Sequence, residues 1–270
     1  MQWQLPGLGV TFHLYGLIVG LAMAVGGWLM ELKAKREHIN TTQLWPMIAG
    51  GLLGALIGAR LWHVATDFPL YTHNWWAIVQ VWQGGLSILG AIAGGVLGLK
   101  ITRHFFYNSE NISLSQLLDL SVYGLPVAQG IGRVGNWVNQ ELYGLPTTLP
   151  WGIFIEPQHR LAGYESQAYY HPLFAYEMIF TLGFAAWLWW REFNLVAFEK
   201  RKNKKATWLQ FGCGNIFTVY ILYYAVLRWG LEFLRLEKAG SGIYTLSINQ
   251  VIITIVIFLL TWKLCLAKHD

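Results

Sequence analysis

The sequence predicts an all-α, polytopic membrane protein with seven transmembrane helices, an N-terminus outside and a cytoplasmic C-terminus. Three observations lead to this fold class. The chain of 270 residues is 55% hydrophobic and only 12% charged, whereas a soluble domain is about 25% charged. Apolar runs close to the ~20 residues that cross a bilayer recur along the chain. Basic residues gather on alternate connections between these runs.

Seven apolar runs are candidates for spans, at about 10–30, 44–65, 84–102, 114–133, 173–190, 212–233 and 247–264. The first is too long for a signal peptide and lacks a basic leader, because residues 1–11 carry no charge. The fourth is the weakest, because Asp119 and Gln129 lie within it. We expect 1–270 to form a single integral membrane domain, in which 134–172 is a small outer (periplasmic) head.

Lysine and arginine predict the orientation. If seven spans alternate, 13 of the 19 basic residues fall on one side, and the positive-inside rule makes that side cytoplasmic. The net charge of +5 is then explained by basic cytoplasmic loops, and no nucleic-acid partner is expected. The 13 residues are Lys33, Lys35, Arg36, Lys100, Arg103, Arg191, Lys200, Arg201, Lys202, Lys204, Lys205, Lys263 and Lys268.

Six basic residues remain on the outer side, against this trend. Arg133 and Arg228 are placed at the ends of apolar spans, where a charge is costly without a partner. Snorkelling or a salt bridge explains either one alone. Two or three arginines on one face favour an anion site, because the guanidinium fork matches phosphate. The six are Arg60, Arg133, Arg160, Arg228, Arg235 and Lys238.

Small residues predict which helices pack together. Glycines recur at four-residue spacing in the second and third spans, so each set lies on one helix face and lets backbones approach. We expect these two spans to pack against each other. Trp75, Trp76 and Trp82 near their outer ends are typical of a stretch that lies at the membrane interface. The glycines are Gly50, Gly54 and Gly58, and Gly90, Gly94 and Gly98.

The two cysteines, Cys213 and Cys265, are far apart and form no CxxC pair, so a zinc site or disulfide framework is not expected. The sequence predicts no metal and no cofactor. An intramembrane protease fits poorly, because Ser87 and the scattered histidines form no nucleophile elbow with a partner histidine.

The most informative segment is Gly130–Gly144, which starts at the outer end of the fourth span. Arg133, Asn136, Asn139 and Glu141 concentrate polar groups where the bilayer excludes them. If the helix continues, Arg133 and Asn136 share a face. The bare pattern is equally compatible with a polar helix end.

Two further clusters occur at the outer ends of spans. His171-Pro172 and Tyr176-Glu177 begin the fifth span, and a carboxylate at membrane depth needs a cationic partner such as an outer arginine. At the end of the sixth span, helical spacing would align four polar residues in one stripe. There we expect Glu232 to orient an arginine and to leave Arg228 facing an anion. The stripe is Tyr224, Arg228, Glu232 and Arg235.

Together these motifs resemble the prolipoprotein diacylglyceryl transferase family, in order and over essentially the whole chain. The run from Gly132-Arg133 through Asn136 and Asn139 to Glu141 and Gly144 is similar to its signature. The other matching segments are Tyr15-Gly16-Leu17, Gly84-Gly85-Leu86-Ser87, His171-Pro172 with Tyr176-Glu177, Tyr224 with Arg228, Glu232 and Arg235, and Leu246-Ser247 with Gln250.

The chain departs from the family pattern at three places. Leu89 stands where many members carry His or Tyr, Leu173-Phe174-Ala175 replaces more polar residues, and Asn249 replaces Gly. If the histidine acts as a base, this chain lacks it. His13, the substrate phosphate or water are the remaining acceptors for a proton.

The resemblance implies that the diacylglyceryl group of phosphatidylglycerol moves to the lipobox cysteine thiol of a secreted prolipoprotein, giving a thioether and glycerol phosphate. It implies a multi-pass protein of the bacterial cytoplasmic (inner) membrane with its active site toward the outer face. Phosphatidylglycerol, the prolipoprotein signal peptide and membrane lipids are then its partners. A non-catalytic anionic-lipid-binding paralogue or a transporter is the alternative.

The resemblance also implies roles for individual residues. Arg133 and Arg228 would hold the phosphate, and Tyr15 would donate a hydrogen bond. The expected substrate-binding residues are Asn136, Asn139, Glu141, Gly144, His171, Tyr224, Glu232, Arg235 and Ser87.

Overall fold

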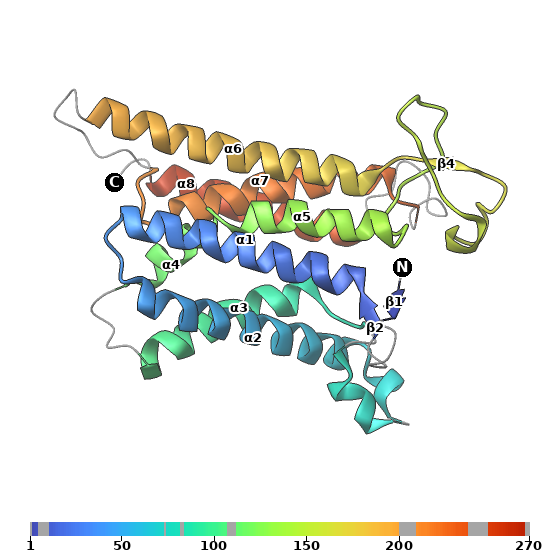
Figure 1. The fold of residues 1–270 in the computed structure, drawn as a ribbon, viewed down its shortest axis with the longest axis horizontal. Coiled ribbons are helices and arrows are strands. Elements are labelled where there is room, and N and C mark those ends of the chain that lie inside the picture. The colour runs from blue at the N-terminus through green and yellow to red at the C-terminus, as the bar shows by residue number, and fades with distance from the viewer. Residues whose placement is uncertain are drawn as a thin grey trace. The chain divides into compact units, whose positions relative to one another are not determined.

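A computed structural model of the chain describes residues 2–4, 11–72, 74–81, 84–106, 112–199, 209–236 and 248–267, and most of these residues are helical (Figure 1). Contacts divide the chain into two compact units, Met1–Met30 with Leu118–Asp270, and Glu31–Leu117. The helices are α1 (Leu14–Arg36), α2 (Thr41–Thr66), α3 (Ile88–Phe106), α4 (Leu114–Ser121), α5 (Leu125–Val138), α6 (Leu173–Glu199), α7 (Asn215–Leu231) and α8 (Ile248–Ala267).

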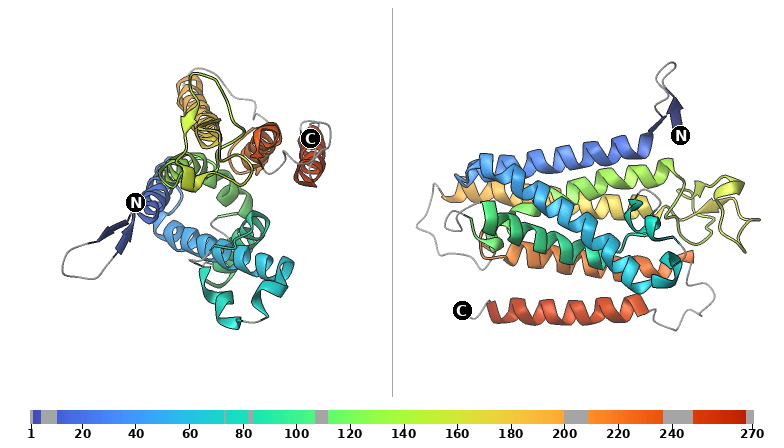
Figure 2. Two further views of the ribbon diagram at one scale, coloured as in Figure 1. Left: turned by 90° about the vertical axis from the view of Figure 1, so that its right-hand side faces the viewer. Right: turned by 90° about the horizontal axis from the view of Figure 1, so that it is seen from below.

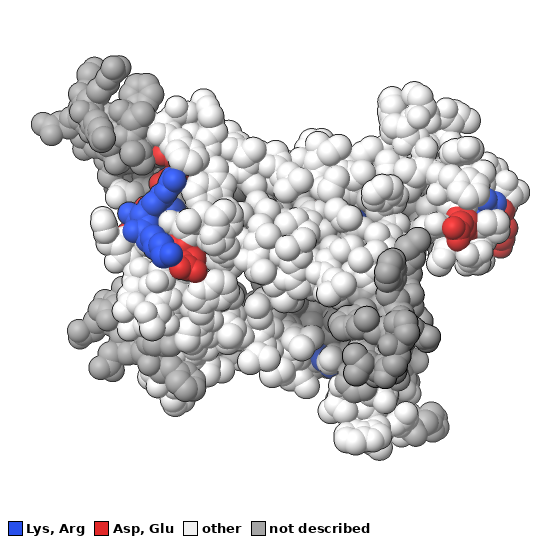
Figure 3. All heavy atoms as spheres, viewed as in Figure 1, with Lys and Arg blue, Asp and Glu red and all other residues white. Residues whose placement is uncertain are grey.

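Among the described residues, five helices are long and apolar enough to cross a membrane. They are α1, α2, the Ile88–Phe105 part of α3, the Leu173–Asn194 part of α6, and Asn215–Leu234, which includes α7. They match the first, second, third, fifth and sixth predicted spans. The described apolar part of the seventh, Gln250–Cys265, is shorter. Residues other than Lys, Arg, Asp and Glu cover most of the described part of the face drawn in Figure 3, as expected of helices that contact lipid.

The fourth predicted span is not one continuous helix. It consists of α4 and α5, with a turn at 122–124 between them. Pro126 lies in the first turn of α5, where its missing N–H costs no hydrogen bond. The polar residues of this segment have partners. Asp119 accepts backbone N–H groups of Gly212 and Phe217, each at 2.9 Å, and Gln129 accepts the hydroxyl of Tyr220.

In the first unit, α5 packs against α6 and α8 packs against α7 (Figure 2). A buried cluster from the α4–α5 turn, α6 and α7 forms its core; it includes Tyr123, Leu188 and Tyr220. Helix α1 approaches the α4–α5 turn closely at Gly26, where a Cβ on Gly124 would collide with the carbonyl oxygen of Gly26.

Two short antiparallel hairpins accompany the helices: β1 (Gln2–Gln4) with β2 (Thr11–His13), and β3 (Ile153–Phe154) with β4 (Tyr169–Tyr170). The β3–β4 hairpin belongs to the predicted head. Its core contains Tyr143, Ile155 and Tyr170, and burial raises the pKa of Tyr143. In the head, Arg160 donates hydrogen bonds to the carbonyl oxygens of Ile155 at 2.9 Å and Glu165 at 2.7 Å.

In the second unit, α2 and α3 pack through their glycine faces, as the four-residue spacing predicts. A Cβ on Gly54 would collide with the carbonyl oxygen of Gly94, and one on Gly58 would collide with that of Gly90. Any side chain at these positions would separate the two helices. Asn40 caps α2 by accepting the N–H of Thr42 at 3.0 Å.

Arg60 has a structural role within this second unit. It is 6% exposed, and it donates to the carbonyl oxygens of Ile78 and Gly85, each at 2.9 Å, and to others in the same loop. The loop carries the 3-10 helices η1 (Phe68–Tyr71) and η2 (Trp75–Val79). Trp75 and Trp76 are exposed on η2, as expected of an interfacial stretch, whereas Trp82 lies outside the described residues.

Candidate active site

Three helices of the first unit bring two arginines to one carboxylate. Glu177, near the start of α6, is only 2% exposed. One of its oxygens pairs with Arg133 of α5, and the other lies 3.1 Å from Arg228 Nη1 of α7. Tyr224, one turn before Arg228 on the same helix face, donates its hydroxyl to Glu177 at 2.6 Å. The expected cationic partner of Glu177 is thus a pair of arginines.

A second chain of hydrogen bonds extends from Arg133 along the signature segment. Arg133 Nη1 donates to Asn136 Oδ1 at 3.1 Å, and Asn136 Nδ2 donates to Glu141 Oε1 at 2.8 Å. Asn139 reaches the same Glu141 oxygen at 3.5 Å. Since α5 continues to Val138, Arg133 and Asn136 share a helix face as the spacing predicts. Each polar group of this segment orients the next.

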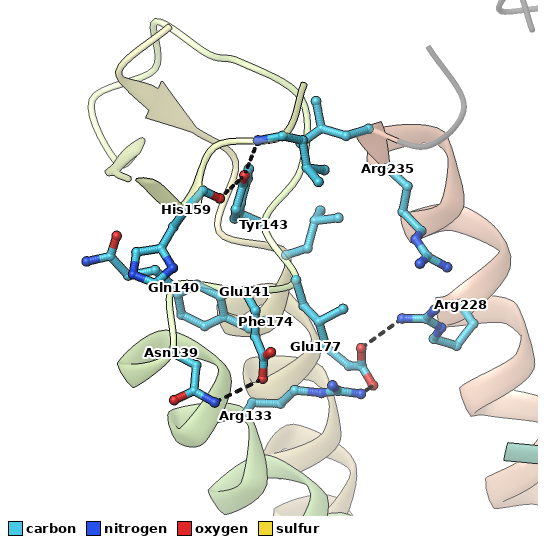
Figure 4. A pocket seen from close by; sticks show the side chains of 14 residues that line it. Arg133, Asn139, Gln140, Glu141, Tyr143, His159, Phe174, Glu177, Arg228 and Arg235 are labelled. Carbon is cyan, nitrogen blue, oxygen red and sulfur yellow. Dashed lines mark hydrogen bonds and ion pairs between the residues drawn. The ribbon is translucent and has the colours of Figure 1, made fainter. Parts of the chain in front are cut away.

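Residues of both clusters line one pocket, with a volume of about 320 Å³ (Figure 4), whereas Tyr224 and Asn136 lie behind its wall. Three arginines and two glutamates line it, so positive charge is in excess. Such a wall favours an anionic group, and guanidinium forks bind phosphate oxygens in pairs. The polar lining residues include Arg133, Arg228, Arg235, Glu141, Glu177 and His159, and the apolar ones include Leu161, Leu173 and Phe174.

Glu232 does orient an arginine, because it pairs with Arg235 at 3.3 Å. Arg228 lines the pocket as expected, but it is paired with Glu177 rather than free of a partner. Helix α7 ends at Leu231, and Glu232 begins the 3-10 helix η5 (Glu232–Leu234). The N–H of Glu232 still donates to the carbonyl oxygen of Arg228, as in an α-helix, and Arg228 and Arg235 line the same pocket.

Gly144 and His171 brace the head rather than line the pocket. The N–H of Gly144 donates to the carbonyl oxygen of His171 at 2.8 Å, and a Cβ on Gly144 would lie 2.6 Å from the carbonyl oxygen of Leu234. The His171 ring bonds the hydroxyl of Tyr176 at 3.0 Å. These contacts tie the segment after α5 to the start of α6 and the end of η5.

Tyr15 packs its ring against α5, where a Cβ on Gly135 would lie 2.8 Å from Tyr15 Cδ2. Within the described part of the chain, its hydroxyl has no hydrogen-bond partner. Ser87 belongs to the second unit, where its N–H donates to the carbonyl oxygen of Ala59 at 3.0 Å. Leu89 is half-exposed on α3 of the same unit. His13 ends β2, but its side chain lies outside the described residues.

Sequence reasoning missed several lining residues, among them Gln140 and His159. Gln140 has a φ of 51°, and its side-chain oxygen accepts the N–H of Glu156 at 2.8 Å, which folds the head back over the end of α5. His159 ends the 3-10 helix η4 (Pro157–His159). Pro157, at the start of η4, is a sequence signal for that turn. No local pattern, however, distinguishes His159 from the other histidines of the sequence.

Comparison with known proteins agrees with this geometry. The profile of the prolipoprotein diacylglyceryl transferase family matches residues 3–266. The chain is similar to the phosphatidylglycerol–prolipoprotein diacylglyceryl transferases of Thermosynechococcus vestitus (32% identity, over 97% of this chain and 92% of the relative) and Synechocystis (31%, over 99% and 93%). It is 38% identical to a second enzyme of that name from Streptomyces coelicolor, over 85% of this chain and 67% of the relative. The chain therefore belongs to the prolipoprotein diacylglyceryl transferase family.

Proposed function

We propose that this protein transfers the diacylglyceryl group of phosphatidylglycerol to the lipobox cysteine thiol of a secreted prolipoprotein. The relatives are named for this reaction. One observation in the structure carries the proposal. Arg133 and Arg228 are held by the single buried carboxylate of Glu177 on the wall of a pocket. That arrangement leaves positive charge to receive the phosphate of an anionic lipid.

The reaction needs such charge most in the transition state. The sulfur attacks the glyceryl carbon that bears the phosphate, a C–S bond forms, and the C–O bond to phosphate breaks. The electron pair of that bond goes to the departing glycerol phosphate, whose negative charge therefore grows. Arginines already oriented by Glu177 stabilise this charge without reorganising during the reaction. The pocket thus suits the leaving group better than the intact lipid.

The remaining predicted residues divide into three groups within this proposal. Asn136, Asn139 and Glu141 form a polar network beside the arginines and suit the hydroxyl groups of a glycerol headgroup. Arg235 lines the pocket beside Arg228 and adds to its positive charge. The others support the site indirectly: Tyr224 holds Glu177, Glu232 pairs with Arg235, and Gly144 and His171 keep the head in place. Tyr15 and Ser87 are retained as proposed contacts to substrate.

We also propose that residues 1–270 act as one membrane domain with seven spans, an external N-terminus and an active site that faces outward from the bacterial inner membrane. The 13 basic residues predicted to share the cytoplasmic side support this orientation. A reporter fused after Lys205 should be cytoplasmic, and one inserted within 145–165 should be external. Reporters on the same side would contradict the seven-span topology.

The direct test of function is chemical. Purified protein in phosphatidylglycerol vesicles is incubated with a lipobox peptide, and the peptide is analysed by mass spectrometry. A mass increase of one diacylglyceryl group on the cysteine, together with released glycerol phosphate, supports the proposal. A Cys→Ser peptide is the control and should stay unmodified. Lipid binding without any thioether would favour a non-catalytic lipid-binding protein.

A further inference from the structure

The proposed reaction requires a proton acceptor, and the inference below rests on that function. A free thiol has a pKa near 8.5 and only its thiolate is a good nucleophile. Something close to the sulfur must therefore take the proton as the C–S bond forms. The candidates are the side chains that line the pocket.

Most of the polar side chains that line the pocket already have hydrogen-bond partners within the protein. Glu177 accepts hydrogen bonds from two arginines and a tyrosine, and Glu141 accepts from two asparagine amides. The hydroxyl of Tyr143 donates to a backbone carbonyl at 2.6 Å and accepts a backbone N–H at 2.9 Å. Guanidinium groups stay protonated and cannot act as bases.

His159 differs from all of these. Its side chain lines the pocket, and within the described residues its imidazole has no hydrogen-bond partner. Imidazole is also the side chain whose ordinary titration lies closest to neutral pH, which makes it the most common general base in proteins. Chemistry thus singles out His159 among the lining residues.

The backbone holds His159 in place independently of its side chain. Its N–H donates to the carbonyl oxygen of Glu156 at 2.9 Å, and its own carbonyl oxygen accepts the hydroxyl of Tyr143 at 2.6 Å. The N–H of Glu156 in turn donates to the side chain of Gln140 at 2.8 Å. Replacing the imidazole therefore leaves these contacts intact.

The placement also suits a displacement reaction at carbon. Such a reaction requires the nucleophile and the leaving group on opposite sides of the carbon. Figure 4 shows His159 on one side of the pocket, and Glu177 with Arg228 on the other. If the arginines hold the departing phosphate, the attacking sulfur approaches from the side of His159.

We propose that the imidazole of His159 accepts the proton of the lipobox cysteine thiol. The S–H electron pair stays on sulfur and forms the C–S bond, the C–O bond breaks toward phosphate, and the imidazolium later releases its proton to water. The charged and titratable groups around His159 are Glu156 and Arg160 beside it in the chain and Glu141 and Tyr143 from the segment after α5. Across the pocket lie Glu177 and three arginines, Arg133, Arg228 and Arg235. Carboxylates and guanidiniums ordinarily titrate far from neutral pH.

The test compares thioether formation by the parent protein, His159→Gln and His104→Gln over a range of pH. His104 is an exposed imidazole on α3 and serves as the matched control. At neutral pH, His159→Gln should lower kcat by about 10²-fold or more, the range for loss of a general base, while KM for phosphatidylglycerol stays within about threefold. The parent and His104→Gln should lose rate as the pH is lowered, because the imidazole becomes protonated, and His159→Gln should not show this loss. The difference in rate between parent and His159→Gln should shrink above about pH 9, because the thiol then ionises without a base.

Other outcomes overturn the inference in distinguishable ways. If His159→Gln is slower than the parent by the same factor at every pH, His159 only positions the loop. If its rate equals that of the parent, His159 has no role in the reaction. If His159→Gln is too slow to profile, His159→Ala is assayed with added imidazole, and lack of rescue counts against proton transfer. A parent protein that forms no thioether at all would refute the proposed function itself.

Discussion

Replacing Glu177 by Gln tests whether orientation or net charge makes the two arginines effective. The substitution keeps the size of the side chain and removes one negative charge between Arg133 and Arg228. If only net charge matters, the variant should bind and turn over an anionic lipid better than the parent protein. If orientation matters, turnover should fall although attraction for the lipid grows.

The structure indicates the magnitude. The carboxylate has two oxygens and satisfies two guanidiniums and the hydroxyl of Tyr224. An amide keeps one acceptor oxygen and turns an N–H₂ group toward a guanidinium. Removing one partner from a buried charge pair costs about 3–5 kcal/mol. The side chains of Arg133 and Arg228 are 19% and 29% exposed, so water compensates part of this, and we expect about 3 kcal/mol. If this free energy is added to the activation barrier of the transfer, kcat falls roughly 10²-fold.

The assay measures kcat and KM for phosphatidylglycerol by mass spectrometry of the lipobox peptide, with thermal unfolding as a check on folding. Asp119→Asn is the matched control. Asp119 is also a fully buried carboxylate of the first unit, but it caps backbone N–H groups at the start of α7. Phe217, which it contacts, is about 16 Å along the helix from Arg228. The control should lose stability and keep its kinetic constants when folded.

Two results would refute the reasoning. Unchanged or faster turnover by folded Glu177→Gln would mean that the arginines need no orienting carboxylate. An equal kinetic loss in Asp119→Asn would mean that general loosening of the first unit, rather than the arginine pair, limits the reaction.

Three further changes give separate tests. Arg133→Gln and Arg228→Gln should each lower turnover about 10²-fold or more, and Lys at either position should restore it only partly. Arg103→Gln is the control and should leave turnover unchanged. If both Gln variants turn over at the parent rate, other residues bind the phosphate. Leu89→His should change turnover less than tenfold, because the pocket already holds an imidazole, and a rise of roughly 10²–10⁴-fold would show that the parent lacks a base. Tyr143→Phe leaves two backbone groups without a partner and should destabilise the head by about 1–3 kcal/mol. Since burial raises the pKa of Tyr143, the hydroxyl stabilises the fold below about pH 10 and less above it, so thermal unfolding of parent and variant should converge at higher pH.

The sequence by itself determined the helical membrane class and much of the candidate site. Hydropathy placed the helices α1, α2, α3, α6 and α7, because apolar runs of bilayer length form helices whatever surrounds them. Glycine spacing predicted the contact between α2 and α3, and the spacing within α5 predicted that Arg133 and Asn136 meet. These features depend on neighbours within one or two helical turns, which the order of residues specifies directly.

Only the tertiary structure decided which charges pair. Three arginines that were all predicted to be on the outer side looked alike in sequence, yet Arg60 donates to backbone carbonyl oxygens while Arg133 and Arg228 share Glu177. His159 reaches the pocket because the head folds back over α5. Such pairings depend on the depth and rotation of separate helices and on the path of a long loop. Local spacing specifies neither, since each helix can turn about its own axis without any change in its pattern.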